Sequence, residues 1–219
     1  GTQGGYGGGG SPPPVSGDGR YVAFASAASN LVAGDTNGRD DVFVRDTVAG
    51  TTTRVSVATD GTQSDSSGTR SPAVSDDGRY VAFTSSSSNL VAGDTNGTND
   101  VFVRDTVAGT TTRVSVAGGG TQSDADSDYP AVSGDGRYVV FTAAAPDHQM
   151  ISSDQGVFVR DTVAGTTTPI LVVAAGDYFS GVYPDVSGDG RYVTFTSFAS
   201  DLVPGDTNNT VDVFAHRFR

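Results

Sequence analysis

The chain has 219 residues, of which 13 are basic and 25 acidic, and its formal net charge of −12 corresponds to a pI of about 4.2. Such an acidic surface repels phosphate backbones, which argues against nucleic acid as a partner. The lack of cysteine excludes disulfides, thiol nucleophiles and thiolate metal sites, and no apolar run approaches the roughly 20 residues of a membrane span.

The chain opens on a Gly- and Pro-rich segment over residues 1–14, GTQGGYGGGGSPPP. This composition suits a flexible linker. The alternative is that residues 1–10 dock on an open sheet edge or on another subunit, because Tyr6 and the Pro12–Pro14 run favour an extended path.

From residue 15 onwards the sequence repeats itself. The phrase SGDGRYVAF at Ser16 returns with small changes at Ser75, Ser133 and Ser187, a period of about 54 to 59 residues. A second phrase, DVFVRDTVAGTTTRVSVA, begins at Asp41 and Asp100, has a weaker copy at Gly156, and stops early as DVFAHRFR at Asp212. The chain therefore divides into a domain over 15–219 with repeats of about 1–59, 60–117, 118–175 and 176–219.

Each repeat contains four strand signals, here taken from the second copy. The predicted strands are Pro72–Ser75, Tyr80–Ser85, Val101–Asp105 and Thr112–Ala117, with an Asp-Gly turn after the first and a Val-Ala-Gly turn after the third. Val, Phe, Tyr and Thr dominate these runs, as is typical of strands. The runs are nearly continuous rather than alternating, which indicates sheets covered on both faces, as in blades stacked around an axis.

One consensus carries a resemblance to a known family. It reads Pro-x-Val-Ser-x-Asp-Gly-Arg-Tyr-Val-x-Phe and is followed by Val-Phe-Val-Arg-Asp. It resembles the TolB-like, WD-repeat-like β-propeller family of bacterial envelope and secreted proteins, in which Asp46, Asp105 and Asp161 take the place of the aspartate after the third strand. The resemblance implies an all-β propeller of four four-stranded blades, or four blades of a larger ring, and leaves function open.

The fourth copy departs from this pattern because it lacks a fourth strand. The segment Val211–Ala215 is therefore expected to form an open edge, and open edges invite strand pairing. Residues 1–10, a neighbouring protomer, or sequence outside the chain could each cover it.

The loop between the second and third strands contains candidate metal ligands in three copies. These are Asp35, Asn37 and Asp41, then Asp94, Asn96 and Asp100, and finally Asp206, Asn208 and Asp212. Oxygen side chains at alternate positions of a tight turn suit Ca²⁺. The other interpretation is an Asx turn in which these side chains satisfy backbone N–H groups. The third copy, DHQMISSDQG from Asp147, has lost the motif.

No set of residues predicts catalysis. The turn aspartates Asp18, Asp77, Asp135 and Asp189 occur once per repeat, and an enzyme needs one asymmetric constellation rather than four equal positions. The strand arginines Arg45, Arg104 and Arg160 are expected to pair with neighbouring carboxylates, Asp46, Asp105 and Asp161. His148 and His216 have no repeated partner, and neither lies near a nucleophile elbow.

The repetition favours a non-enzymatic structural or interaction propeller of a secreted or cell-surface bacterial protein. Its open edge and Gly-rich start suggest self-association, with a filament as one form. The alternative is a propeller that binds a glycan or another surface protein, with Ca²⁺ as a cofactor in one version. A hydrolase or lyase is a more distant alternative.

Overall fold

The computed structural model describes residues 12–144, 155–173, 183–200, 202–208 and 210–219, which form four antiparallel sheets. The first sheet contains β1 (Tyr21–Ser26), β2 (Asp41–Asp46) and β3 (Thr51–Arg54), and the second contains β4 (Arg70–Val74), β5 (Tyr80–Ser85), β6 (Asp100–Asp105) and β7 (Thr110–Arg113). The third contains β8 (Ser127–Val132), β9 (Tyr138–Ala144), β10 (Gln155–Asp161) and β11 (Thr166–Val173), and the fourth contains β12 (Asp185–Val186), β13 (Tyr192–Ser197) and β14 (Asp212–Arg217). This confirms the predicted all-β blades.

Within each sheet the strands lie in sequence order, from the inside of the molecule outwards. In the first sheet the innermost strand is reduced to a bridge between Val15 and Val22. The fourth sheet ends at β14, which pairs only with β13 among the described residues. The prediction that the last blade lacks its outer strand is therefore confirmed, with the edge at Asp212–Arg217 rather than Val211–Ala215.

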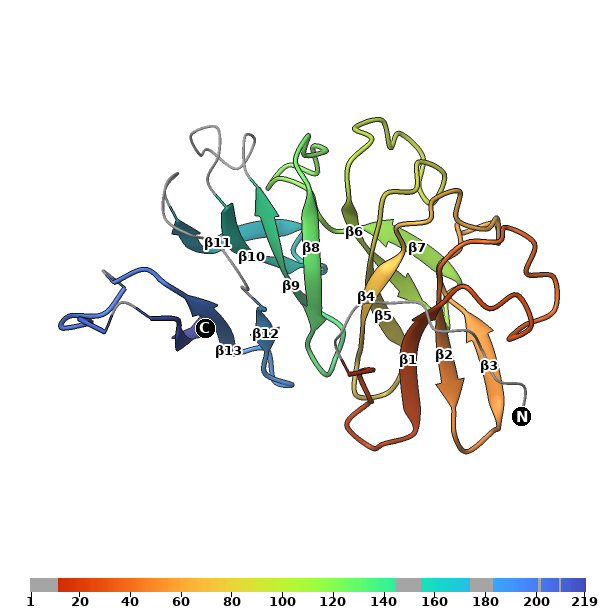
Figure 1. The fold of residues 1–219 in the computed structure, drawn as a ribbon, viewed down its shortest axis with the longest axis horizontal. Helices are drawn as coiled ribbons and strands as arrows, with labels where there is room; N and C mark the ends of the chain where they lie inside the picture. Colours follow the sequence, from red (N-terminus) through yellow and green to blue (C-terminus); the bar gives the residue numbers. More distant parts are fainter. Residues whose placement is uncertain (1–11, 145–154, 174–182, 201, 209) are drawn as a thin grey trace.

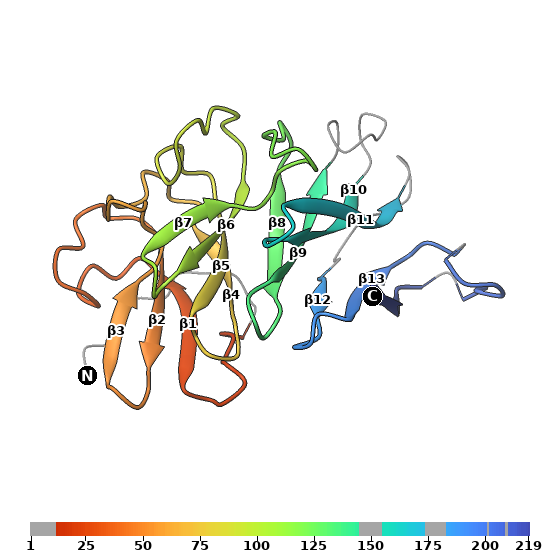
Figure 2. The same cartoon turned by 180° about the vertical axis from the view of Figure 1, so that it is seen from behind.

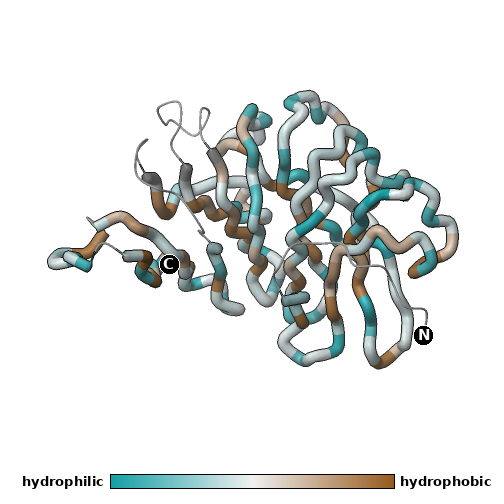
Figure 3. Tube along the Cα trace, viewed as in Figure 1, coloured by the Kyte–Doolittle hydropathy of each residue, from teal (hydrophilic) through white to brown (hydrophobic). Residues whose placement is uncertain are grey.

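The four sheets follow one another in an arc (Figures 1 and 2). The first sheet lies at one end and the fourth at the opposite end in both views. Apolar residues concentrate along the strands, and hydrophilic residues in the connecting loops (Figure 3). Among the described residues there is no helix with the length and apolar character to cross a membrane.

The core lies between neighbouring blades, in three clusters that each join two sheets. In one cluster Val42 and Val44 of the first blade pack on Phe83 and Phe102 of the second. We call the face of a blade that packs on the next blade its forward face, and the opposite face its rear face. Because successive side chains of a strand point to opposite faces, one Val-Phe-Val run supplies both.

The Ser-x-Asp-Gly turns hold the first two strands of each blade together, as the sequence predicted. In the second blade Ser75 donates its hydroxyl to Asp77 (2.7 Å), whose carboxylate accepts the backbone N–H of Arg79 (2.9 Å). Gly78 has a positive φ of 72°, which glycine adopts without the cost of a Cβ. The turn aspartates are therefore turn-forming residues.

The same turns meet at the centre of the arc. The backbone N–H of Asp76 donates to the carbonyl of Gly134 (3.1 Å), and Gly134 donates to Gly188 (3.0 Å). A Cβ added to Gly134 would lie 2.8 Å from the carboxyl carbon of Asp76, and one added to Gly17 would lie 3.0 Å from it. Asp76 thus occupies the space that glycine leaves free in the neighbouring copies.

The fourth strand of the blade is shorter than predicted. In the second blade β7 covers Thr110–Arg113, whereas the sequence pattern placed the strand at Thr112–Ala117. After Arg113 the N–H groups of Val114 and Ser115 both reach the carbonyl of Val101 (2.8 and 3.4 Å), whereas the N–H of Val101 donates to the Ser115 hydroxyl (3.0 Å), which in turn donates to Asp100 (2.5 Å). A side chain therefore replaces the regular ladder there, which ends the strand.

Candidate functional site

The loops that carry the predicted metal ligands are closed by hydrogen bonds between those same residues. In the first blade the Asn37 amide nitrogen donates to Asp41 (2.9 Å), and the Asn37 oxygen accepts the backbone N–H of Arg39 (3.1 Å). The second and fourth blades repeat the pattern, with Asn96 bonded to Asp100 at 2.9 Å and Asn208 bonded to Asp212 at 3.1 and 3.2 Å. These contacts are those of the Asx-turn interpretation.

An arginine from the outer strand supplies the positive charge next to the loop carboxylates. Arg54, at the end of β3, lies 3.1 Å from Asp35 and 3.5 Å from Asp41. In the second blade Arg113 lies 3.1 Å from Asp94 and 3.3 Å from Asp100. The described residues contain no group of three or more Asp or His side chains placed to hold a metal ion. Calcium at these nine positions stays a prediction.

Sequence reasoning missed Arg54 and Arg113, although a signal was present. Both end a Thr-Thr-Thr-Arg run, and both belong to repeats that keep the loop motif. The third repeat has lost the motif and has Pro169 in place of the arginine. In the part of the chain that the structure describes, the fourth repeat keeps the motif but has no outer strand, and Asp206 and Asp212 form no ion pair. A calcium-binding test of this loop therefore distinguishes best between a Ca²⁺ site and an Asx turn.

Burial decides the electrostatics of this loop network. The side chains of Asp41 and Asp100 are completely buried. Burial raises the pKa of both carboxyls, while hydroxyl groups donated by Ser56 and Ser115 oppose the rise. Each aspartate thus depends on its arginine and its serine to remain charged, as buried carboxylates do in general.

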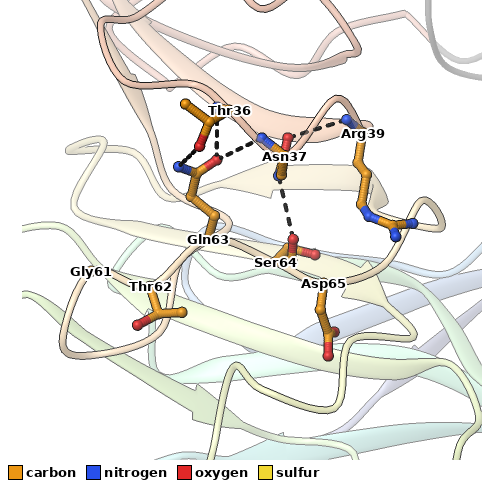
Figure 4. A pocket seen from close by; sticks show the side chains of 8 residues that line it. All are labelled: Thr36, Asn37, Arg39, Gly61, Thr62, Gln63, Ser64 and Asp65. Atoms are coloured by element: carbon orange, nitrogen blue, oxygen red, sulfur yellow. Dashed lines mark hydrogen bonds between the residues drawn. The ribbon is translucent and has the colours of Figure 1, made fainter.

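A polar hollow of about 500 Å³ lies over this network in the first blade (Figure 4). Gln63 reaches across it, accepting the N–H groups of Thr36 and Asn37 (3.2 Å each) and donating to the carbonyl of Gly34 (2.8 Å). The polar groups on the two sides of the hollow therefore already form hydrogen bonds with one another. No histidine lines the hollow; His148 lies outside the described residues, and His216 is exposed on β14.

The arginine–aspartate pairs differ from those expected. Arg20, rather than Arg45, donates two hydrogen bonds to Asp46 (2.7 and 3.0 Å), and Arg45 instead bonds Thr52 (3.1 Å). The same correction applies to Arg104 and Arg160, because Asp105 pairs with Arg79 and Asp161 with Arg137. Adjacent strand residues point to opposite faces, so an arginine cannot reach the aspartate that follows it.

In the first three blades the tyrosine of the Asp-Gly-Arg-Tyr phrase lies on the glycine turn of the next blade. The rings of Tyr21 and Tyr80 cover Gly78 and Gly136 so closely that a Cβ on either glycine would lie only 2.1 or 1.9 Å from a ring carbon. The ring of Tyr138 also covers Gly190, where a Cβ would lie 2.4 Å from a ring carbon. The contact of an aromatic ring with a glycine therefore occurs at each of the three junctions between blades.

The comparisons with known proteins identify the fold. No family model and no curated protein matches the sequence. The structure is similar to TolB from Acinetobacter baumannii (16% identity, TM-score 0.54), covering 94% of this chain and 40% of that one. It is also similar to a putative TolB from Agrobacterium tumefaciens (18% identity, TM-score 0.57), covering 93% and 60%.

The fold is that of a TolB-like β-propeller.

A third similar structure is the β-propeller domain of the Trilobed protease from Pyrococcus furiosus, which has an open velcro topology (11% identity, TM-score 0.53). The propeller described here covers 55% of that chain, so it spans less than two thirds of each of these three proteins.

The forward face of the fourth blade exposes apolar side chains that are buried in the other blades. Val213 is 77% exposed, whereas its counterparts Val42, Val101 and Val157 are all 0% exposed. Tyr192 is 46% exposed, compared with 2% for Tyr138 in the third blade. The residues that elsewhere form the core between blades are therefore at the surface here.

Proposed function

We propose that this chain is a non-enzymatic interaction module of a secreted or surface bacterial protein, and that it self-associates through its open blade. The observation that carries the proposal is the exposure of Val213, which occupies a core position of the repeat. An exposed apolar patch on a soluble domain commonly marks an interaction site. A contact of this kind that does not close on itself builds a filament.

The charged residues support an architectural role over a catalytic one. The Arg20–Asp46 pair recurs as Arg79–Asp105 in the second blade, with the same 2.7 Å separation. Groups that recur from blade to blade stabilise the repeat, whereas catalysis needs a single constellation in which the groups differ. Residues 1–10, which the sequence suggested as a cover for the open edge, lie outside the described residues.

The test is the mass of the intact chain by light scattering over a concentration series. We expect the mass to rise with concentration, and to rise further in salt, because two partners of charge −12 repel each other. Negative-stain electron microscopy of the same samples then distinguishes filaments from discrete oligomers.

The variant Val213→Asp should lower the mass at a given concentration. Its matched control is Val163→Asp, which adds the same charge at a turn valine that is 76% exposed. A single monomeric mass throughout the series would refute self-association. Equal effects of the two variants would mean that charge alone, and not the open blade, governs it.

A further inference from the structure

The junctions within the chain show what the open blade is shaped to bind. At each junction a tyrosine of one blade lies on the Asp-Gly turn of the next, as Tyr80 does on Gly136. Its neighbours on the same forward face pack against the phenylalanines of the next rear face, in clusters of almost fully buried residues. The partner of a forward face is therefore the rear face of a blade of this repeat.

The two halves of one further junction lie at opposite ends of the arc (Figures 1 and 2), and both have exposed residues. On the fourth blade, Tyr192 is 46% exposed. On the first blade, Gly19 has the same turn geometry, with φ of 75°, and no described atom lies within 4 Å of the position of a Cβ. At the internal junctions that space is filled by a tyrosine ring.

The rear face of the first blade is partly uncovered as well. Val22 and Phe24 are half-buried, whereas their counterparts Val81 and Phe83 in the second blade are 0% exposed. The exposed forward face and the incompletely covered rear face are thus the two complementary sides of the internal junction.

We propose that the forward face of the fourth blade binds the rear face of the first blade of a second copy, with Tyr192 seated on Gly19 of that copy. This inference rests on the proposed self-association and specifies its geometry. The contact is head-to-tail, so each copy keeps one free face of each kind and the chain of copies can grow.

Two substitutions on the forward face indicate a weaker contact than the internal ones. The fourth blade has Thr194 where the others have Ala or Val, and Ala215 where the others have Val. A hydroxyl and a smaller side chain reduce the apolar area that the contact buries. A reversible, concentration-dependent association follows from this.

The first variant pair blocks the turn. Gly19→Asn retains a residue that tolerates positive φ and places a side chain where the ring of Tyr192 should lie. The matched control is Gly38→Asn, because Gly38 also has a positive φ (63°) with open space around it, and the fourth repeat itself has Asn209 at that position. We expect Gly19→Asn, and not the control, to weaken association about tenfold or more.

The second variant pair removes the ring. Tyr192→Ser should weaken association to a similar degree, whereas Tyr183→Ser, which changes a tyrosine that is 57% exposed outside the forward face, should not. Melting temperatures of all four variants establish that they fold.

A mixture of Gly19→Asn and Tyr192→Ser distinguishes head-to-tail from symmetric contacts. Each variant retains one intact face, so light scattering of the mixture should show dimers and no larger species, while each variant alone stays monomeric. Association that is insensitive to both substitutions would overturn this geometry and leave the proposed function standing. A wild-type chain that is monomeric at every concentration would overturn both.

Discussion

Glycine at the Asp-Gly turn adopts a positive φ and leaves space for a tyrosine ring. Substitutions at two different glycines separate these two contributions to stability. At Gly136 the backbone needs a positive φ of 74°, and the ring of Tyr80 from the preceding blade lies against the missing side chain. At Gly97 the φ is also positive, at 68°, but the surroundings are open. The difference between the two sites therefore measures the packing of one blade on the next.

We predict that Gly136→Ala destabilises the propeller by roughly 3 kcal/mol, and that Gly97→Ala costs only about 1 kcal/mol. The left-handed backbone accounts for about 1 kcal/mol at both sites, and displacement of the Tyr80 ring adds about 2 kcal/mol at the first. Urea unfolding measures both values. Equal losses would show that the ring moves aside without cost.

The carboxylate of Asp105 is held in its charged form by its neighbours. Two hydrogen bonds from the Arg79 guanidinium, aided by the N–H groups of Val107 and Ala108, lower the pKa of Asp105 to about 2. The pKa of an aspartate in an unfolded chain is about 3.9. Since the folded pKa is the lower one, the stabilisation is complete above about pH 4 and is lost as the pH falls towards 2.

Replacing this carboxylate should therefore matter at neutral pH and cease to matter in acid. We expect Asp105→Asn to cost about 1 kcal/mol at pH 7, a modest value because the Arg79 side chain is 40% exposed. The gap to the wild type should close by about pH 2. Unfolding in urea at pH 7, 4 and 2.5 checks this, with Arg79→Gln as the matched partner variant. A gap that is constant across this range would contradict the assignment.

Side-chain hydrogen bonds and ion pairs were predictable from the sequence only where the two residues are close together in the chain. The Ser75–Asp77 turn involves residues two apart, so its spacing indicated the turn directly. The Arg79–Asp105 pair spans 26 residues and depends on which strand faces point inwards. One repeated phrase cannot reveal such long-range pairing, and for this reason the sequence suggested the adjacent arginine.

At the scale of elements, strands were predictable in number and order but not in where they end. The period of the repeat gave β5 and β6 within one residue of their observed bounds. The end of β7 depends on the Ser115 hydroxyl, which accepts the backbone N–H of Val101 in place of a strand carbonyl. The Val-Ser-Val pattern after Arg113 resembles a continuing strand, because hydrophobic pattern does not encode a side chain that replaces a backbone partner.

The hydrogen bonds and ion pairs around the loop likewise involve residues from other parts of the blade. Asp94 and Asn96 suggested a metal-binding turn when considered alone, but Arg113 from the outer strand completes their surroundings. A buried carboxylate without such a partner would be costly. A loop motif and the end of a distant strand therefore form one unit, which explains why the two are present or absent together in the first three repeats.

At the scale of the whole molecule, stability should vary along the arc. Interior positions of the second blade, such as Val81 and Val101, are 0% exposed because blades flank it on both sides. Among the described residues, the fourth blade has a neighbouring blade on one side, and its β14 is an edge strand. In repeat architectures each unit depends mainly on contacts with its neighbours, so local opening should concentrate at the end with fewest contacts.

Hydrogen exchange measured by mass spectrometry tests both the local stability of the fourth blade and its association with a second copy. In dilute solution, amides of β14 (Asp212–Arg217) should exchange faster than those of β6 (Asp100–Asp105). As the concentration rises, a second blade seated on the forward face should slow exchange in β13 and β14 and leave β6 unchanged, since β6 is already covered. The variant Tyr192→Ser should abolish that concentration dependence without changing the dilute pattern. Exchange in β14 that is equally slow at every concentration would mean that the fourth blade is already stable without a partner.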